Sequence, residues 1–282
     1  MKLIRHGEKG LPGIELKGER LDCSMHFEDW NRDFFQNEGL KHLTQIISER
    51  AETLTVVHPD SKWCAPVARP GMILCVGLNY SDHAKESNMD IPSEPVLFMK
   101  ATNTIVGPYD DVAFPKGSTK MDWEVELGIV IGKDALYLES QDQASDHIAG
   151  FCVVNDLSER SFQLESTGQW VKGKSCPGFS PIGPYMVTKD EVDTSDLEMN
   201  LSVNGIAKQE GSTKTMIFNP SFIVHYVSQF MKLEAGDVIS TGTPPGVGFG
   251  MNPPEFLQPG DVMELSIEGL GRQRQTIVNV TS

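Results

Sequence analysis

Two acidic side chains in the segment DWEVELGIVIGK, residues 122–133, have the type and spacing of a metal or acid–base site. Alternate residues of an extended strand face the same way, so Glu124 and Glu126 project side by side. Gly128 and Val130 follow on the same face. An exposed strand face is the plain alternative, because carboxylates are usually solvated. The small and apolar residues argue instead that this face becomes buried, where neighbouring like charges are costly without a cation.

A third acid, Asp156, ends the apolar run FCVVND. An acid at the end of a strand is well placed to share a site with Glu124 and Glu126. Three carboxylates without a histidine or cysteine partner are hard ligands, which suit Mg²⁺, Mn²⁺ or Ca²⁺ rather than zinc. We predict Mg²⁺, with Mn²⁺ or Ca²⁺ as substitutes, because a site of three acids leaves coordination positions for water and substrate.

The segment GQWVKGKS, residues 168–175, has the spacing G-x-x-x-x-G-K-S of a loop that binds nucleotide phosphates. A true phosphate loop lies between a buried strand and the helix that it opens. Here the polar stretch ERSFQLEST precedes the motif, and the prolines and glycines of CPGFSPIGP, which follows it, are incompatible with a helix. We therefore predict that the match is accidental and that the chain is not a nucleotide hydrolase. Lys174 then needs another role, unless it is a solvated surface lysine.

A histidine and a glutamate lie three residues apart in YSDHAKES. On a helix, His83 and Glu86 would share a face. Glu86 could then orient the imidazole while His83 takes a proton from water, although an exposed helical pair is the alternative. Residues 88–90 lead to Pro92, which is consistent with a lid over the substrate.

Short strands must position these side chains from residue 72 onward. Four compact apolar runs have the composition of buried strands: MILCVG at 72–77, VELGIVIG at 125–132, FCVVND at 151–156 and YMVT at 185–188. LEMNLSVNG, residues 197–205, alternates apolar and polar residues before Asn-Gly and predicts a hairpin.

Two helices are expected beside the strands. One covers Leu40–Arg50, and the other is capped by Asn219 and ended by Gly236. WCAPVARPG, residues 63–71, has the prolines and glycine of a linker. We predict a small N-terminal domain over residues 1–66 and a metal-dependent catalytic domain over residues 67–282.

The composition excludes several classes of partner. The 282 residues include 24 Lys and Arg against 39 Asp and Glu, a net charge of −15 that would repel a nucleic-acid backbone. The sequence shows no apolar run of the roughly 18 residues needed to span a bilayer, so no membrane partner is expected. The five cysteines form no C-x-x-C pair, which favours free thiols in a reducing compartment and a cytoplasmic location.

Six blocks, taken in order, closely resemble the fumarylacetoacetate hydrolase family: VGLNYSDHAKES, EPVLFMK, DWEVELGIVIGK, VVNDLSERSFQ, GQWVKGKS followed by PIGPYMV, and STGTPPGVG. They extend from about Cys75 to Gly248. Within the family, SERSFQ and GQWVKGKS are most similar to bacterial 2,4-diketo-3-deoxy sugar-acid hydrolases and ureidoglycolate lyase-like proteins. The resemblance implies an α+β fold whose catalytic domain is a mixed, barrel-like β-roll, and it implies a homodimer.

The resemblance also implies roles for eight residues of this chain. They are the metal ligands Glu124, Glu126 and Asp156, the catalytic residues His83, Glu86 and Lys174, and the substrate-binding residues Lys100 and Thr243. Fumarylacetoacetate hydrolase has a further metal-binding aspartate upstream, to which no residue is assigned here.

Together these observations predict a Mg²⁺-dependent hydrolase. Its substrate would be an acylpyruvate or a 2,4-diketo-3-deoxy sugar acid, cleaved at a C–C bond to pyruvate and a hydroxy acid. The metal would stabilise the departing enolate. Because the same residues could stabilise an enolate without attack by water, an oxaloacetate decarboxylase, a diketo-acid isomerase or a ureidoglycolate lyase is an alternative. A metal-stabilised binding protein without turnover is an alternative from another class.

Overall fold

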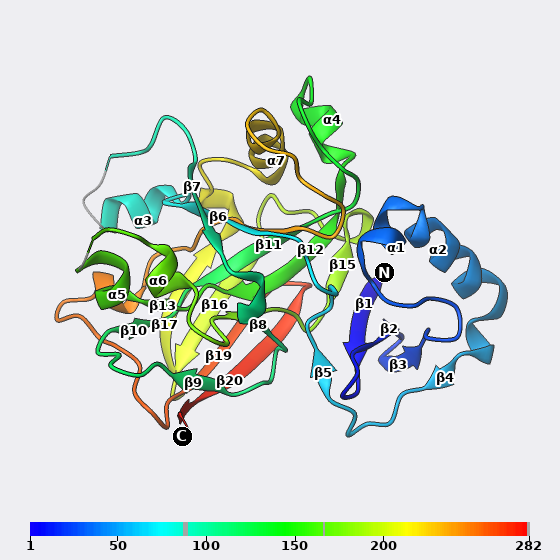
Figure 1. The fold of residues 1–282 in the computed structure, drawn as a ribbon, viewed down its shortest axis with the longest axis horizontal. Coiled ribbons are helices and arrows are strands. Elements are labelled where there is room, and N and C mark those ends of the chain that lie inside the picture. The colour runs from blue at the N-terminus through cyan, green and yellow to red at the C-terminus, as the bar shows by residue number, and fades with distance from the viewer. Residues whose placement is uncertain (87–89, 166, 281–282) are drawn as a thin grey trace.

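The computed structural model describes residues 1–86, 90–165 and 167–280, apart from the side chain of Glu86. The fold is α+β, with two main β-sheets and short helices at their edges (Figure 1). The predicted fold class is confirmed, but over the residues that the structure describes the large sheet has two free edges and does not close into a barrel. Among the described residues, no helix has the length and apolar character needed to cross a bilayer.

The large sheet contains eleven strands and extends from the N-terminal segment across the region that begins at residue 72. Its strands in spatial order are β4 (Thr55–Val56), β3 (Glu19–Asp22), β2 (Leu11–Leu16), β1 (Lys2–His6), β15 (Met186–Thr188), β12 (Ile148–Asn155), β11 (Val125–Ile131), β18 (Val238–Ser240), β6 (Ile73–Gly77) and β7 (Val96–Lys100), with β5 (Trp63–Cys64) paired to β1. The four apolar runs that were predicted to be strands form β6, β11, β12 and β15, so these predictions are confirmed.

The central strands β11 and β12 are buried along their whole length. Side-chain alternation gives each strand two apolar faces that contact different cores. Leu127 and Ile129 belong to a core formed by residues between Leu74 and Ile277, whereas Val130 belongs to a second core that includes the N-terminal strands and helices. The face that carries Glu126 is therefore buried further along, as the sequence predicted, and the structure shows that the N-terminal core covers it.

The N-terminal region continues the large sheet. Strand β1 pairs antiparallel with β15, where Leu3 lies opposite Met186. The helices α1 (Arg32–Gln36) and α2 (Gly39–Arg50) cover these strands on the outer side of the molecule (Figure 1). The division at residues 66 and 67 stays a prediction, but no break in the sheet accompanies it.

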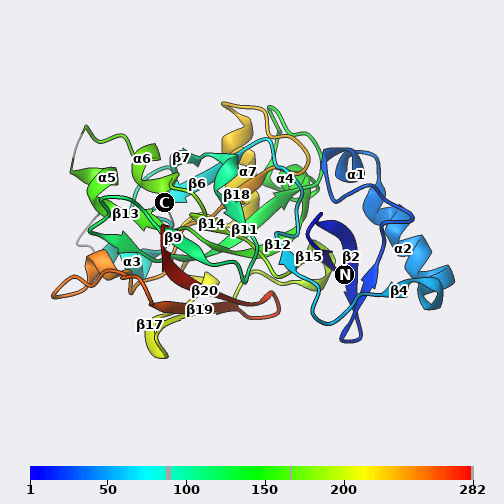
Figure 2. The ribbon, with the colours of Figure 1, turned by 60° about the horizontal axis from the view of Figure 1, so that its bottom comes forward.

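The second sheet packs below the large one (Figure 2). Its five strands in spatial order are β17 (Ile206–Ser212), β16 (Glu198–Val203), β19 (Val262–Ile267), β20 (Gly271–Asn279) and β9 (Val112–Phe114). The predicted hairpin joins β16 and β17 through Asn204 and Gly205, whose φ angles of 52° and 76° fit a type I′ turn. Two shorter pairs are β10 (Met121–Asp122) with β13 (Ser158–Glu159), and β14 (Ser180–Pro181) with β8 (Ile105–Val106).

The remaining described helices are α3 (Ser81–Glu86), α4 (Gln141–Ser145), α5 (Arg160–Leu164), α6 (Val171–Lys174) and α7 (Pro220–Ser228). The side chain of Asn219 caps α7 by accepting a hydrogen bond from Phe222, as predicted. The predicted end at Gly236 is wrong, because α7 stops at Ser228 and Gly236 lies in a later turn with φ 89°.

Candidate active site

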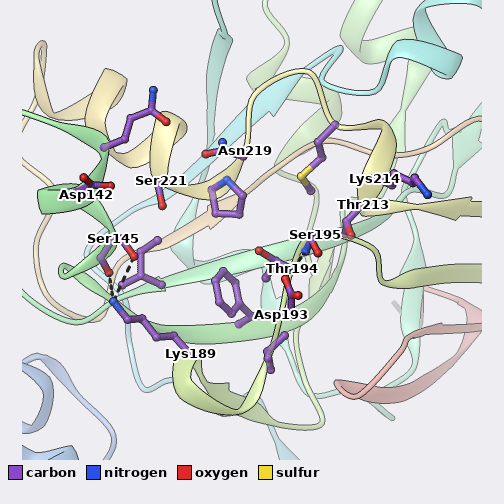
Figure 3. A pocket seen from close by; sticks show the side chains of 16 residues that line it. Asp142, Ser145, Lys189, Asp193, Thr194, Ser195, Thr213, Lys214, Asn219 and Ser221 are labelled. Atoms are coloured by element: carbon purple, nitrogen blue, oxygen red, sulfur yellow. Dashed lines mark hydrogen bonds between the residues drawn. The ribbon is translucent and has the colours of Figure 1, made fainter.

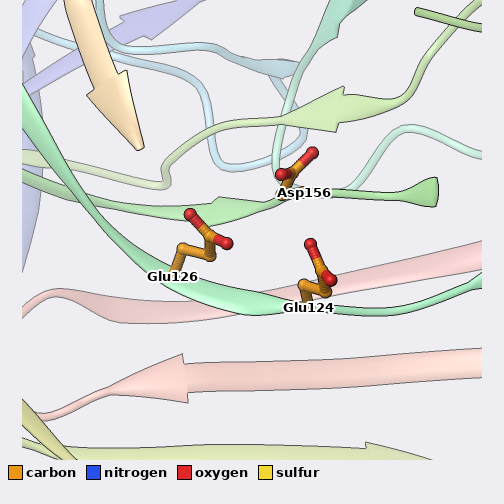
Figure 4. Close-up of side chains that lie close together, drawn as sticks. All are labelled: Glu124, Glu126 and Asp156. Atoms are coloured by element: carbon orange, nitrogen blue, oxygen red, sulfur yellow. The ribbon is translucent and has the colours of Figure 1, made fainter. Parts of the chain in front are cut away.

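Three buried carboxylates meet at one end of the strand pair β11–β12. Glu124 directly precedes β11, Glu126 lies on it, and Asp156 directly follows β12. The antiparallel register pairs Glu126 with Val154, and the amide of Asp156 donates to the carbonyl of Glu124 at 2.9 Å. One oxygen from each carboxylate lies within 4.8 Å of the others (Figure 4). The pairing of the two strands thus brings together acids about 30 residues apart in sequence.

Burial distinguishes this cluster from an ordinary acidic strand face. Glu124, Glu126 and Asp156 are 7%, 3% and 0% exposed. The alternative of a solvated strand face is therefore wrong. A buried carboxylate destabilises the protein unless a positive group pairs with its charge. The basic side chains around the cluster therefore determine which carboxylate is left to bind an added cation.

Glu124 and Asp156 are compensated by basic side chains. Lys174 Nζ donates to Glu124 Oε2 at 2.6 Å and to Asp156 Oδ2 at 2.7 Å, and Arg160 Nη2 donates to Glu124 Oε1 at 2.6 Å. Burial alone would raise the pKa of Glu124, but the charges of Lys174 and Arg160 outweigh it and hold this pKa below its ordinary value. Burial alone would lower the pKa of Lys174, but the carboxylates raise it, so the ammonium stays charged. Lys174 is 2% exposed, and its interpretation as a solvated lysine is wrong.

Glu126 lacks such compensation. Its Oε2 accepts hydrogen bonds from the Ser240 hydroxyl at 2.6 Å and the Gly242 amide at 2.8 Å. Burial, with the charges of Asp156 and Glu124, raises its pKa to about 8 in the metal-free protein. No ion pair joins Glu126 to a lysine or arginine in the part of the chain that the structure describes. A cluster of hard carboxylate oxygens, one of them without a cationic partner, fits a divalent cation, although the ligand roles remain predicted.

The cluster opens onto a cavity of about 490 Å³. Among the residues assigned from the sequence, His83, Glu124, Glu126, Lys174 and Thr243 line it. The structure thus brings the acids, the lysine and the histidine to one concave site, which is the usual form of a small-molecule pocket.

Thr243 is hydrogen-bonded within the protein through its hydroxyl. The hydroxyl of Thr243 donates to the carbonyl of Val125 at 2.9 Å and accepts from Gln209 Nε2 at 2.8 Å. Its proton is therefore used within the protein, which leaves an acceptor lone pair for a ligand.

His83 lies on α3, but the side chain of Glu86 and residues 88–89 of the expected lid lie outside the described residues. The His83–Glu86 contact stays a prediction.

Lys100 lies behind the cluster rather than on the cavity wall. Its ammonium donates to an Asp156 carboxylate oxygen, to the carbonyl of Leu157 at 3.0 Å and to the carbonyl of Phe179 at 2.7 Å. These acceptors use all three protons of the ammonium, and the side chain is 1% exposed. This geometry favours positioning of Asp156 over the direct substrate contact that the resemblance implied.

Two residues of the cavity, Arg160 and Gln163, received no role from the sequence. Arg160 Nε donates to Asp122 Oδ2 at 2.8 Å, and its Nη1 donates to Gln163 Oε1 at 3.2 Å. Helix α5 carries both residues and begins where the Glu159 side chain accepts from the amide of Ser161. The available signal was the polar block SERSFQ directly after Asp156, since one helical turn there faces the cluster.

The phosphate-loop motif forms a different structure. Helix α6 has four residues and ends at Lys174, and no helix opens directly after it. A Cβ on Gly173 would lie 2.4 Å from the carbonyl of Glu159 and 2.6 Å from Gln163, so this glycine permits close packing of α6 on α5. Lys174, the lysine of the motif, instead donates hydrogen bonds to Glu124 and Asp156.

A larger hollow of about 590 Å³ lies between α4, α7 and the loop after β15 (Figure 3). Of its two lysines, Lys189 donates to the carbonyl of Ser145 at 2.5 Å, and Lys214 donates to Asp196 Oδ2 at 3.3 Å. Its acids, Asp142 and Asp193, do not belong to the buried carboxylate cluster. We therefore place the chemistry in the smaller cavity.

Known proteins resemble this chain in sequence and in fold. Residues 72–278 match the family described as fumarylacetoacetate (FAA) hydrolase C-terminal. A putative hydrolase of Burkholderia ambifaria is 47% identical over 284 residues, covering 99% of each chain. The structure of a fumarylacetoacetate hydrolase from Exiguobacterium antarcticum has a TM-score of 0.86 and 36% identity, covering 99% of this chain and 100% of that chain.

A maleylpyruvate hydrolase from Sphingobium sp. SYK-6, solved with manganese (II) and pyruvate, has a TM-score of 0.84 and covers 100% of both chains. At 24% identity, this likeness shows a shared fold.

Proposed function

Since this chain belongs to the fumarylacetoacetate hydrolase family, we propose that it is a divalent-metal-dependent hydrolase that cleaves a C–C bond of an acylpyruvate-type 2,4-diketo acid. The products would be pyruvate and a carboxylic acid. The observation that carries this proposal is the buried cluster of Glu124, Glu126 and Asp156 beside the charged Lys174 in one cavity. Mg²⁺ is the proposed ion, and Mn²⁺ is a substitute that a protein of the same fold contains.

The three carboxylates would hold the ion. When bound, it would supply Lewis-acid stabilisation of the negative charge that develops on the keto-acid half of the substrate. Lys174 would stabilise the same charge electrostatically, because two of its three protons are held by Glu124 and Asp156 and one is left for a substrate oxygen. Since its pKa is raised, Lys174 would act as a fixed cation rather than as a base.

His83 would act as the general base. It would take a proton from the water that attacks the carbonyl of the acyl half. The C–C bond then breaks, its electron pair passes to the departing pyruvate enolate, and the enolate carbon receives a proton to give pyruvate. One water is consumed, and the acyl half leaves as a carboxylate.

Turnover of acetylpyruvate tests this function. The purified protein is freed of metal with EDTA, loaded with Mg²⁺ or Mn²⁺, and assayed by coupling pyruvate formation to lactate dehydrogenase. We expect pyruvate formation with either ion, none in EDTA, and loss of both activity and bound metal in Glu126→Ala. Activity that persists in EDTA, or turnover of oxaloacetate without any 2,4-diketo acid, would contradict the hydrolase proposal.

The proposal includes two expectations about the protein in the cell, a homodimer and a cytoplasmic location. Light scattering after size-exclusion chromatography should give twice the chain mass of 31.1 kDa. Cell fractionation should recover the protein with cytoplasmic markers. A monomeric mass, or recovery with membranes, would contradict the respective expectation.

A further inference from the structure

Apart from the carboxylates and their cations, most side chains that line the cavity are apolar, and His83, Gln163 and Thr243 are the polar exceptions. Phe98 and Trp170 pack edge to face with ring centroids 5.2 Å apart. Leu164 and Phe249 line the same cavity and are 42% and 48% exposed, and Val247 completes this surface. Large apolar side chains left open inside a pocket gain free energy when a ligand covers them.

The basic side chains of the cavity are already paired. The basic residues that line it with a lysine or arginine side chain are Lys174 and Arg160. Arg160 bonds Asp122 and Glu124, and Lys174 bonds Glu124 and Asp156. A negatively charged group at the far end of a substrate would therefore meet no uncompensated cation from these two side chains.

Few polar groups remain for a substrate with several hydroxyls. The Thr243 hydroxyl donates its proton to Val125 and keeps one acceptor position, and Gln163 Oε1 accepts from Arg160, so that the Gln163 amide nitrogen is the donor left between these two side chains. Each buried hydroxyl of a ligand that lacks a partner carries a penalty. A polyhydroxylated sugar acid fits this wall poorly.

The aromatic wall is held in place by hydrogen bonds. The carboxylate of Asp122 accepts from the amides of Gly248 at 2.7 Å and Phe249 at 3.1 Å, and the same group binds Arg160. The Arg160 guanidinium carbon lies 5.9 Å from the centre of the Phe249 ring. Asp122 is 0% exposed, so the loop that carries Phe249 is anchored in the interior.

From this arrangement we propose that the acyl half of the substrate is an uncharged alkyl or aryl group, held between the Phe98–Trp170 pair and Phe249. This inference rests on the proposed function for the reaction. The inference adds the chemical class of the acyl half, which the carboxylate cluster does not bind. It predicts that alkyl and aryl acylpyruvates are substrates in preference to 2,4-diketo-3-deoxy sugar acids.

A series of 2,4-diketo acids tests the proposal. The metal-loaded enzyme is assayed for kcat/KM with acetyl-, butanoyl-, hexanoyl- and benzoylpyruvate, a 2,4-diketo-3-deoxy sugar acid, and a 2,4-diketo acid with a terminal carboxylate. We expect kcat/KM to rise about fourfold for each added methylene, as burial of one methylene predicts. The sugar acid and the terminal carboxylate should fall below acetylpyruvate. Preference for either of them, or no dependence on chain length, would overturn the inference.

Variants locate the effect in the aromatic wall. Phe249→Ala and Trp170→Ala should each flatten the dependence on chain length. Phe230→Ala is the matched control, because Phe230 is 63% exposed and does not line this cavity. A chain-length dependence that survives both wall variants would place the acyl half elsewhere and overturn the inference.

Binding of inert 2-oxo acids separates this inference from the proposed function. Calorimetry on the Mn²⁺-loaded protein compares pyruvate, 2-oxohexanoate and 2-oxo-4-phenylbutanoate. Affinity that rises with apolar length and falls in Phe249→Ala supports the inference, even if no diketo acid is turned over and the hydrolase proposal fails. Equal affinity for the three acids would overturn the inference, even if turnover is observed.

Discussion

Replacing Glu126 by glutamine should stabilise the metal-free protein. Glu126 is 3% exposed, and burial with its neighbouring acids raises its pKa from the ordinary 4.5 to about 8. The folded protein holds this proton to higher pH than the unfolded chain, so stability falls as the pH rises through this window. At about 1.4 kcal/mol for each pH unit above the ordinary pKa, the loss at pH 7 is about 3 kcal/mol.

Glu126→Gln removes this loss while keeping the shape of the side chain. Its Oε1 can accept the bonds from Ser240 and Gly242, and its Nε2 can donate to Glu124 or Asp156. In EDTA, the variant should therefore exceed the parent in unfolding free energy by about 3 kcal/mol at pH 7, and the difference should shrink to less than about 1 kcal/mol at pH 5.

Metal should narrow this difference. An ion at 100 times its dissociation constant adds about 2.7 kcal/mol to the parent, whereas the variant has lost one ligand charge. Urea unfolding between pH 5 and pH 8, with EDTA or with Mn²⁺, measures both effects. Glu210→Gln makes the same chemical change on an exposed residue of β17 and serves as the control. A variant less stable than the parent in EDTA at every pH, or stabilised equally by Mn²⁺, would refute the reasoning.

Three further substitutions probe other parts of the site. His83→Ala should lower kcat for acetylpyruvate about 10²–10⁴-fold while leaving the stabilisation by Mn²⁺ intact, and a kcat within threefold of the parent would exclude a general-base role. Lys100→Met should lower the unfolding free energy by about 3–5 kcal/mol, because the buried charge of Asp156 loses one of its partners. Urea unfolding measures this loss, and an unchanged unfolding midpoint would contradict the pairing of Lys100 with Asp156. Gly173→Ala should cost about 1–3 kcal/mol in the same assay, since the new methyl group meets the Glu159 carbonyl, and full stability would show that α5 and α6 can separate freely.

The carboxylate cluster was accessible from sequence because its geometry is local to two strands. Strand alternation placed Glu124 and Glu126 on one face, and Gly128 on that face indicated burial. A Cβ on Gly128 would lie 2.7 Å from Cys152 Sγ, which explains the glycine. The position of Asp156 after a buried strand completed the set, since the ends of paired strands lie together.

The role of Lys100 was not accessible in this way. Its ammonium is surrounded by Asp156 and the carbonyls of Leu157 and Phe179, which lie in irregular segments far along the chain. No spacing in the sequence encodes that enclosure. Arg160 was missed for a related reason, because its partner Asp122 precedes β11 and gives no pattern that pairs the two residues.

The continuous large sheet limits how this protein can be recombined with its relatives. Cys152 and Val154 of β12 and Val130 of β11 pack into the core that the N-terminal strands and helices provide. A chimera that takes its first 66 residues from another protein would therefore replace half of a shared core and the strand that covers the edge of β15. Such grafts should fold only when the donor's inward-facing residues complement these side chains, so the two segments are expected to co-vary in evolution rather than to be exchanged as modules.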